Sequence, residues 1–323
     1  MGAPRRRWSP LVTNSVAAGR PRHILLLGGG GFIGRNLAAA LREAGHDVTL
    51  LGRTARSIDG AVVTALALTA TDAILRLIDA RRIDTVVHLV STMLPSSSTA
   101  QFEHEQQAVI APTIALASEL AARGVDLVFV SSGGTVYGAL PRERAREDDA
   151  CAPISLYGEA KRQVELALLE LHAARGLRLL IARPSNPYGP HQALDGAQGL
   201  VSVLLGRVRE GRALDVWGDG SSVRDYIHVA DLARALRDLI ERDVRGTIVN
   251  IGSGMGHSLI EVVRTVEAAT GRRIALDFKP ARAADVPRLV LDVARLRALG
   301  MDHARPLAAG VRSYAAELGL AAD

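Results

Sequence analysis

The sequence is poor in cysteine, in long apolar runs and in aromatic residues. These shortages exclude disulfides, multi-cysteine metal sites, membrane spans and a core built from aromatic side chains. With one cysteine, Cys151, the chain can form no internal disulfide and no multi-cysteine metal site. No stretch approaches the roughly 18 consecutive apolar residues of a membrane span. Aromatic residues are only 3% of the chain, so alanine, leucine and valine must supply the core. We therefore expect a cytoplasmic protein with no metal and no membrane partner.

Lysine is almost as rare as cysteine. Lys161 and Lys279 are the two lysines among the 39 Lys and Arg residues. The formal net charge is +5, yet outside Arg5-Arg-Arg7 the basic residues alternate with Asp and Glu, as on a solvated surface. No nucleic-acid partner is therefore expected, and residues 1–21 are predicted to form a flexible basic extension.

One of the two lysines stands four residues after a tyrosine, in Tyr157-Gly-Glu-Ala-Lys161. On a helix, positions i and i+4 share a face, so the phenol and the ammonium can act together. A nearby cation favours phenolate and lowers the pKa of the tyrosine toward working pH. Arginine would serve poorly here, because its guanidinium is bulky, planar and always protonated. A chance pair on a solvated helix face is the alternative, and this pair alone does not decide between them.

A glycine-rich turn, Gly28-Gly-Gly-Gly31-Phe-Ile-Gly34, favours the chemical interpretation. It follows the apolar run His23-Ile-Leu-Leu-Leu27 and opens the helix-forming segment 36–44. Strand, glycine turn and helix in this order are the context of a dinucleotide-binding turn. The glycines let the backbone approach a pyrophosphate, and the helix N-terminus offers free N–H groups.

Strands and helices alternate from residue 23 to about residue 183, which predicts an α/β fold with a Rossmann-like doubly wound parallel sheet. After Arg183 the regular alternation of strands and helices ends. The next segment can be neither a helix nor a central strand, because it reads Pro184-Ser-Asn-Pro-Tyr-Gly-Pro190. We expect a dinucleotide-binding domain over 22–183 and a smaller substrate lobe over 184–323, some of which returns to the first domain. The expected strands are 23–27, 47–51, 85–90, 127–130 and 179–182, and the expected helices are 36–44, 71–81, 103–123 and 155–175.

Together these features resemble the extended short-chain dehydrogenase/reductase family, in its nucleotide-sugar epimerase/dehydratase branch. The resemblance runs from about residue 23 to residue 300. It rests on the glycine turn, the Tyr157/Lys161 pair and four further motifs in the right order. These motifs are Val130-Ser-Ser-Gly-Gly-Thr-Val-Tyr-Gly138, Arg183-Pro-Ser-Asn-Pro-Tyr-Gly189, Val223-Arg-Asp-Tyr-Ile-His-Val229 and Arg282-Ala-Ala-Asp-Val-Pro287.

The resemblance implies a role for each site residue. Tyr157 would be the acid/base on a sugar hydroxyl, and Lys161 would hold the nicotinamide ribose and lower the pKa of Tyr157. The implied cofactor-binding residues are Gly28, Gly31, Phe32, Ile33, Gly34, Arg53, Val90, Tyr157, Lys161 and Pro184. The implied substrate-binding residues are Ser91, Asn186, Trp217, Arg224 and Arg282, with Asn186 and the two arginines on the diphosphate and Trp217 in the segment that packs the nucleobase. Surface ion pairs are the alternative for the two arginines.

Two positions depart from the family's pattern. Where the family carries a Ser or Thr, three residues before the Val of the Val-Tyr-Gly turn, this chain has Gly133. We expect Ser132, Thr135 or a water beside Gly133 to complete the proton path. At the end of the second strand, where an Asp would select NAD, the chain has Gly52-Arg53. A small residue followed by Arg favours NADP, unless Arg53 is a plain surface arginine.

The choice among the family's reactions is narrowed by the absence of carboxylates just before the Val-Tyr-Gly turn. The resembling dehydratases carry an Asp-Glu pair at the positions of Gly134 and Thr135, and the resembling decarboxylases carry a Glu at Thr135. We therefore expect simple hydride chemistry by a homodimeric UDP-hexose 4-epimerase, in which the glycines at 133 and 134 give the keto-sugar room to turn over. An NADP-dependent 4-keto-sugar reductase is the second hypothesis. A non-catalytic dinucleotide-binding regulator is the third.

Overall fold

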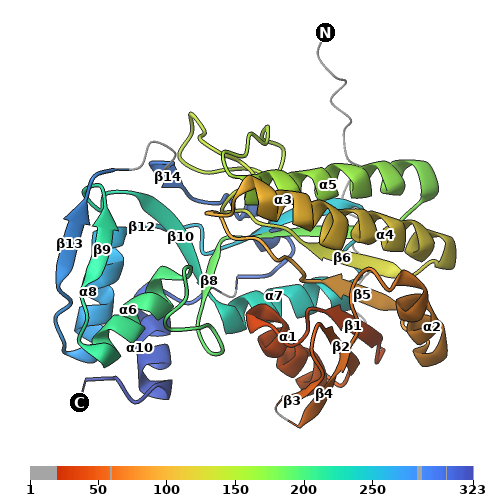
Figure 1. The fold of residues 1–323 in the computed structure, drawn as a ribbon, viewed down its shortest axis with the longest axis horizontal. Coiled ribbons are helices and arrows are strands. Elements are labelled where there is room, and N and C mark those ends of the chain that lie inside the picture. Colours follow the sequence, from red (N-terminus) through yellow and green to blue (C-terminus); the bar gives the residue numbers. More distant parts are fainter. Residues whose placement is uncertain (1–19, 59, 282–285, 303, 323) are drawn as a thin grey trace.

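An eight-stranded sheet forms the centre of the larger part of the molecule in a computed structural model, which describes residues 20–322 except 59, 282–285 and 303 (Figure 1). Its strands are β1 (His23–Leu27), β2 (Asp47–Gly52), β3 (Arg56–Ile58), β4 (Ala61–Ala65), β5 (Thr85–His88), β6 (Asp126–Val130), β7 (Leu179–Pro184) and β11 (Thr247–Ile251). Their spatial order is β11-β7-β6-β5-β1-β2-β4-β3, and every neighbouring pair is parallel except β3 with β4. This is the predicted doubly wound Rossmann-like sheet.

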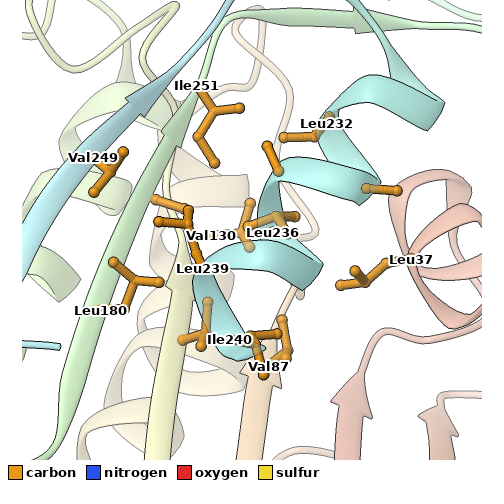
Figure 2. Close-up of a cluster of buried hydrophobic side chains, with 14 of the residues drawn as sticks. Leu37, Val87, Val130, Leu180, Leu232, Leu236, Leu239, Ile240, Val249 and Ile251 are labelled. Carbon is orange, nitrogen blue, oxygen red and sulfur yellow. The ribbon is translucent and has the colours of Figure 1, made fainter. Parts of the chain in front are cut away.

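Helices cover both faces of this sheet because its central strands are apolar on both sides. The helices on one face are α1 (Phe32–Glu43) and α7 (Val229–Glu241), and those on the other are α2 (Thr71–Arg81), α4 (Ala111–Arg123) and α5 (Leu156–Arg175). Within β1, Ile24 and Leu26 join the first core cluster, while Leu25 and Leu27 join the second, as the two-residue period of a strand requires. Figure 2 shows the first cluster, where α7 packs onto the sheet.

The smaller lobe lies to the left of the large sheet in Figure 1 and has its own core. Its strands are β8 (Asn186–Tyr188), β9 (Leu214–Trp217), β10 (Val223–His228), β12 (Gly256–Ser258), β13 (Leu276–Lys279) and β14 (Arg288–Leu289). Its helices are α6 (Leu200–Glu210), α8 (Leu259–Thr270) and α10 (Leu307–Glu317), and α9 (Ala294–Ala298) packs beside β11. As expected, part of the second half returns to the large sheet: α7 packs on α1, and β11 pairs with β7.

The predicted elements are all present, but several of their ends differ, the strand expected over 179–182 continues to Pro184, and one expected helix is divided. The helix expected over 36–44 begins already at Phe32, and the strand expected over 85–90 ends at His88. The helix expected over 103–123 is divided into α3 (Thr99–Glu105), the π-helical turn η1 (Gln106–Ile110) and α4. Pro112 lies in the first turn of α4 and has no N–H to donate to the preceding turn, which explains why the α-helical ladder is interrupted there.

Candidate active site

The glycine turn lies at the carboxyl end of β1 and is shaped for close approach of a ligand. Gly28 has a φ of +82°, a conformation that favours glycine. A Cβ on Gly34 would lie 2.6 Å from the Gly28 carbonyl oxygen, so only glycine allows α1 to pack this tightly on the turn. Gly31 caps α1 without a side-chain hydrogen bond, which leaves the first N–H groups of the helix for an anion. These features fit the pyrophosphate of a dinucleotide.

A pocket of about 320 Å³ runs from this turn along the ends of β2 and β5. Five predicted site residues line it: Gly28, Gly31, Arg53, Val90 and Ser91. Thr54, Arg56 and Thr92 line it as well. The other predicted residues of the turn, Phe32, Ile33 and Gly34, form the first turn of α1, where Ile33 packs against the core. The pocket thus joins the glycine turn to the segment where a dinucleotide's adenosine would lie.

Two arginines border the pocket at the end of β2. Arg53 is exposed, and the Arg56 guanidinium reaches across to donate a hydrogen bond to the Gly30 carbonyl. Gly52 has a different explanation from the one its sequence position indicates. A Cβ there would lie 2.9 Å from a methyl group of Val63, so packing against β4 already explains why the residue is small.

Tyr157 and Lys161 lie in the first turns of α5, which begins where the Ser155 side chain accepts a hydrogen bond from the Gly158 N–H at 3.2 Å. Lys161 is only 6% exposed and donates from Nζ to the Val130 carbonyl oxygen at 3.1 Å. Its Nζ is 5.9 Å from the centroid of the Tyr157 ring. The predicted shared face of the helix is therefore present, turned inward.

The pKa of Tyr157 does not follow the sequence-based expectation. Burial raises the pKa of the phenol to about 12, and a hydrogen bond with the Ser132 side chain opposes this rise. Burial also shifts the pKa of Lys161, lowering it to about 8, and the negative charges of Glu105 and Glu165 oppose this fall. The expectation of a lowered tyrosine pKa was wrong for the protein alone, because the loss of water around the phenol outweighs the interactions that favour phenolate.

Gly133 does not open space for a sugar or for a water, contrary to both expectations. A Cβ at this position would lie 2.7 Å from Leu291 Cδ1 and 2.9 Å from the Arg183 carbonyl oxygen. Of the two candidate substitutes for the missing hydroxyl, Ser132 contacts Tyr157, whereas Thr135 Oγ1 is buried without a hydrogen-bond partner among the described residues. The structure therefore brings Ser132, and not Thr135, to the tyrosine.

Of the predicted substrate residues, Ser91 lines the pocket and Asn186 lies where the chain passes from the large sheet into the smaller lobe. Asn186 begins β8 just after Pro184 ends β7, and its side chain donates to the Asp225 carbonyl oxygen at 2.8 Å. Gly134 faces the Asn186 side chain at ordinary contact distance. Arg224 precedes Asp225 on β10, and Trp217, at the end of β9, is 44% exposed. Arg282 lies outside the described residues.

The family model described as "NAD dependent epimerase/dehydratase family" matches residues 24–252, which span the glycine turn, the Tyr157/Lys161 pair and most of the lobe junction. The chain belongs to this family. It is an enzyme family of the extended short-chain dehydrogenase/reductase type, as the sequence motifs indicated.

Several relatives in the family are similar over most of their length. The UDP-glucose 4-epimerase of Neisseria meningitidis serogroup A is 32% identical over 89% of this chain and 94% of its own. The dTDP-4-dehydro-6-deoxyglucose reductase of Escherichia coli is 30% identical over 69% and 70%. The crystal structure of the UDP-glucose 4-epimerase of Thermus thermophilus in complex with NAD has a TM-score of 0.85 at 28% identity, covering 92% of this chain and 99% of that one.

In the protein described here, a buried ion pair joins α5 to β7. The Arg183 guanidinium donates to both Glu165 oxygens, at 2.8 and 2.6 Å, and both side chains are at most 1% exposed. Arg183 also donates to the Tyr137 hydroxyl at 2.9 Å, and that hydroxyl donates to Asn250 on β11 at 2.7 Å. The network holds the helix that carries Tyr157 and Lys161 against the strand that leads to Asn186.

Sequence reasoning missed a buried carboxylate at the site. Glu105, the last residue of α3, is 2% exposed and accepts hydrogen bonds from Ser91 Oγ at 3.0 Å and from the Thr92 N–H at 3.0 Å. The Thr92 hydroxyl also donates to it. An acidic residue in a polar helix segment gives no sequence signal of burial, so only the fold could find it.

Proposed function

We propose that this protein is a nucleotide-sugar 4-epimerase acting on a UDP-hexose through a transient 4-keto-sugar. The observation that carries the proposal is the inward-facing group of Tyr157, Lys161 and Ser132, in a chain whose glycine turn lines a pocket that fits a dinucleotide. Gly134 and Thr135 supply no carboxylate for eliminating water, which favours plain hydride chemistry. The UDP-glucose 4-epimerases among its relatives and structural neighbours support the same choice.

In this proposal the chain moves the proton and orients both ligands. Bound NAD(P) supplies the hydride acceptor and donor. Tyr157 takes the proton of the sugar hydroxyl being oxidised and returns it on reduction, with Ser132 sharing that proton through its hydrogen bond to the phenol. Lys161 holds the nicotinamide ribose and stabilises phenolate, while Pro184 borders the nicotinamide. Asn186, Arg224 and Arg282 bind the diphosphate, and Trp217 packs on the nucleobase.

A turnover assay without added cofactor tests the proposal. Purified protein is incubated with each of several UDP-hexoses, the products are separated, and the dinucleotide released on denaturation is weighed by mass spectrometry. We expect interconversion of a 4-epimeric pair with no NAD(P)H consumed. A protein that binds UDP-hexoses but leaves them unchanged, with or without added NAD(P)H, would be a binding regulator instead.

A second candidate is an NADP-dependent 4-keto-sugar reductase. The observation that favours it is the pair of arginines, Arg53 and Arg56, at the end of β2, where a 2′-phosphate on the adenosine ribose would lie. The two reactions differ in stoichiometry. A reductase consumes one NADPH for each keto-sugar it reduces, whereas an epimerase recycles its dinucleotide.

We also propose a cytoplasmic homodimer divided near residue 183 into its two lobes. Helices α4 and α5 pack together on one face of the sheet, and we place the contact between protomers on this face, where Leu166 of α5 is 51% exposed. No helix in the described residues is long and apolar enough to cross a membrane. Light scattering after gel filtration measures the mass, and a Leu166→Glu change should shift a dimer toward monomer.

A further inference from the structure

Gly52, the last residue of β2, is a glycine although its backbone does not require one. Its φ lies outside the positive range that favours glycine, unlike that of Gly28. A Cβ on Gly52 would lie 2.9 Å from Val63 Cγ1. Apart from its chain neighbours, the next atom that this Cβ would meet among the described residues is the Thr54 carbonyl oxygen, at 3.9 Å. One methyl group of Val63 therefore keeps this position small.

Val63 cannot easily turn that methyl group away. It lies in the middle of β4, where its backbone is paired with Leu50 of β2 on one side and with Arg56 of β3 on the other. Its side chain is fully buried and belongs to the first core cluster. A β-branched side chain is stiff at χ1, and in a close-packed core a shifted methyl group would have to displace its neighbours. Val63 thus presents a fixed surface to the end of β2.

The contact between Gly52 and Val63 lies at the adenosine end of the pocket, since both residues line the pocket together with Arg53. A carboxylate at the end of the second strand of such a sheet accepts hydrogen bonds from the adenosine ribose and repels a 2′-phosphate. Position 52 is where such a carboxylate would be attached. Because Val63 fills the space of the first side-chain atom, position 52 cannot carry it.

We propose that Val63 is a specificity-determining residue for the dinucleotide, because it holds position 52 to glycine and so keeps out the carboxylate that would favour NAD over NADP. The preference then depends on two residues of neighbouring strands, and exchanging residue 52 alone does not reverse it. This inference rests on the dinucleotide pocket and not on the sugar. It holds whether the reaction is epimerisation or reduction, and it can be measured without any sugar.

A double-mutant cycle on dinucleotide binding tests the proposal. Val63→Ala removes the obstructing methyl groups, Gly52→Asp supplies the carboxylate, and the two changes are made singly and together. Dissociation constants for NAD and NADP are measured by titration calorimetry on protein freed of bound dinucleotide, as verified by mass spectrometry. Val62 precedes Val63 on β4 but is 72% exposed, so Gly52→Asp/Val62→Ala is the matched control.

We expect Gly52→Asp/Val63→Ala to bind NAD about ten- to a hundred-fold more tightly than Val63→Ala does, the effect of hydrogen bonds to a charged acceptor. It should also bind NADP more weakly, because the carboxylate repels the 2′-phosphate. Gly52→Asp alone and Gly52→Asp/Val62→Ala should bind NAD no more tightly than wild type. The same gain in Gly52→Asp alone, or no gain in a folded Gly52→Asp/Val63→Ala protein, would overturn the proposal. Absence of epimerase activity would reject the proposed function and leave this result unaffected.

Thermal unfolding measures the contact without any ligand, and it decides the point even if an aspartate variant does not fold. Gly52→Ala adds only the Cβ, so it should lower the unfolding midpoint by overpacking against Val63. In the Val63→Ala background the same change should lower the midpoint less, because the added methyl group then has room. In the Val62→Ala background it should lower the midpoint as much as in wild type. Equal losses in all three backgrounds would contradict the proposal.

Discussion

The two ends of the proposed active site are built on different principles. At the catalytic end, Lys161, Glu165 and Arg183 are all buried, and the Arg183 guanidinium pairs with the Glu165 carboxylate. At the adenosine end, the pocket is bordered by Arg53, an exposed side chain on a loop. Buried charges cannot be removed singly without leaving a partner uncompensated, whereas exposed charges can. We infer that the catalytic chemistry is fixed by the fold and that cofactor preference is adjustable.

Tyr157→Phe should give the largest effect, at the catalytic end. Removing the hydroxyl removes the proton donor and acceptor, so kcat should fall by about 10²–10⁴-fold. Dissociation constants for dinucleotide and nucleotide sugar should stay nearly unchanged, because the ring remains. Steady-state kinetics with titration calorimetry measures both. Residual activity above a tenth of wild type would remove Tyr157 from its role.

Glu165→Gln tests whether the buried pair of Glu165 and Arg183 is required for stability, as the contrast between buried and exposed charges implies. The change leaves Arg183 buried beside a neutral amide, and losing one partner of a buried pair costs about 3–5 kcal/mol of unfolding free energy. Denaturant unfolding measures the loss. Glu170→Gln, exposed on the same helix, is the control and should change stability by less than about 0.5 kcal/mol. Equal losses of stability in the two variants would contradict the claim that a buried charge costs more to remove than an exposed one.

Arg53→Ala probes the adjustable end, and a smaller, selective effect is expected. If Arg53 pairs with a 2′-phosphate, NADP binding should weaken by roughly ten- to a hundred-fold, while NAD binding is spared. Direct titrations with both dinucleotides on wild type and variant decide the point. Equal losses would mean that Arg53 only stacks on adenine. The absence of any loss would make it a plain surface arginine.

The smallest effect on activity and stability is expected from a change outside both ends of the site, the deletion of the N-terminal extension. Deleting residues 1–21 should leave activity and stability unchanged, provided that Arg22 is kept. Its side chain, directly before β1, pairs with Asp126 at the start of β6 at 3.2 Å and with Asp243 at 2.9 Å. Gel filtration and thermal unfolding compare the two lengths. An insoluble shortened protein would show that the extension packs on the domain.

The sequence predicted those features that depend on local spacing or on strand-and-helix alternation. The large sheet, the glycine turn and the shared face of Tyr157 and Lys161 are of this kind. Features that depend on distant packing could not be predicted. The space beside Gly133 is filled by Leu291, from the far end of the chain, and Glu105 is buried against Ser91 and Thr92, which follow a different strand. The pKa of Tyr157 was misjudged because burial is a tertiary property.

Transfer of deuterium from C4 of a labelled UDP-hexose tests the central claim most directly. The account holds that the hydride removed from the sugar returns to the same sugar while Tyr157 moves the proton. After equilibration with purified protein, mass spectrometry of the separated products should find the label retained at C4 in both epimers, with no dinucleotide consumed. Label lost to solvent, or carried away on released dinucleotide, would contradict the account.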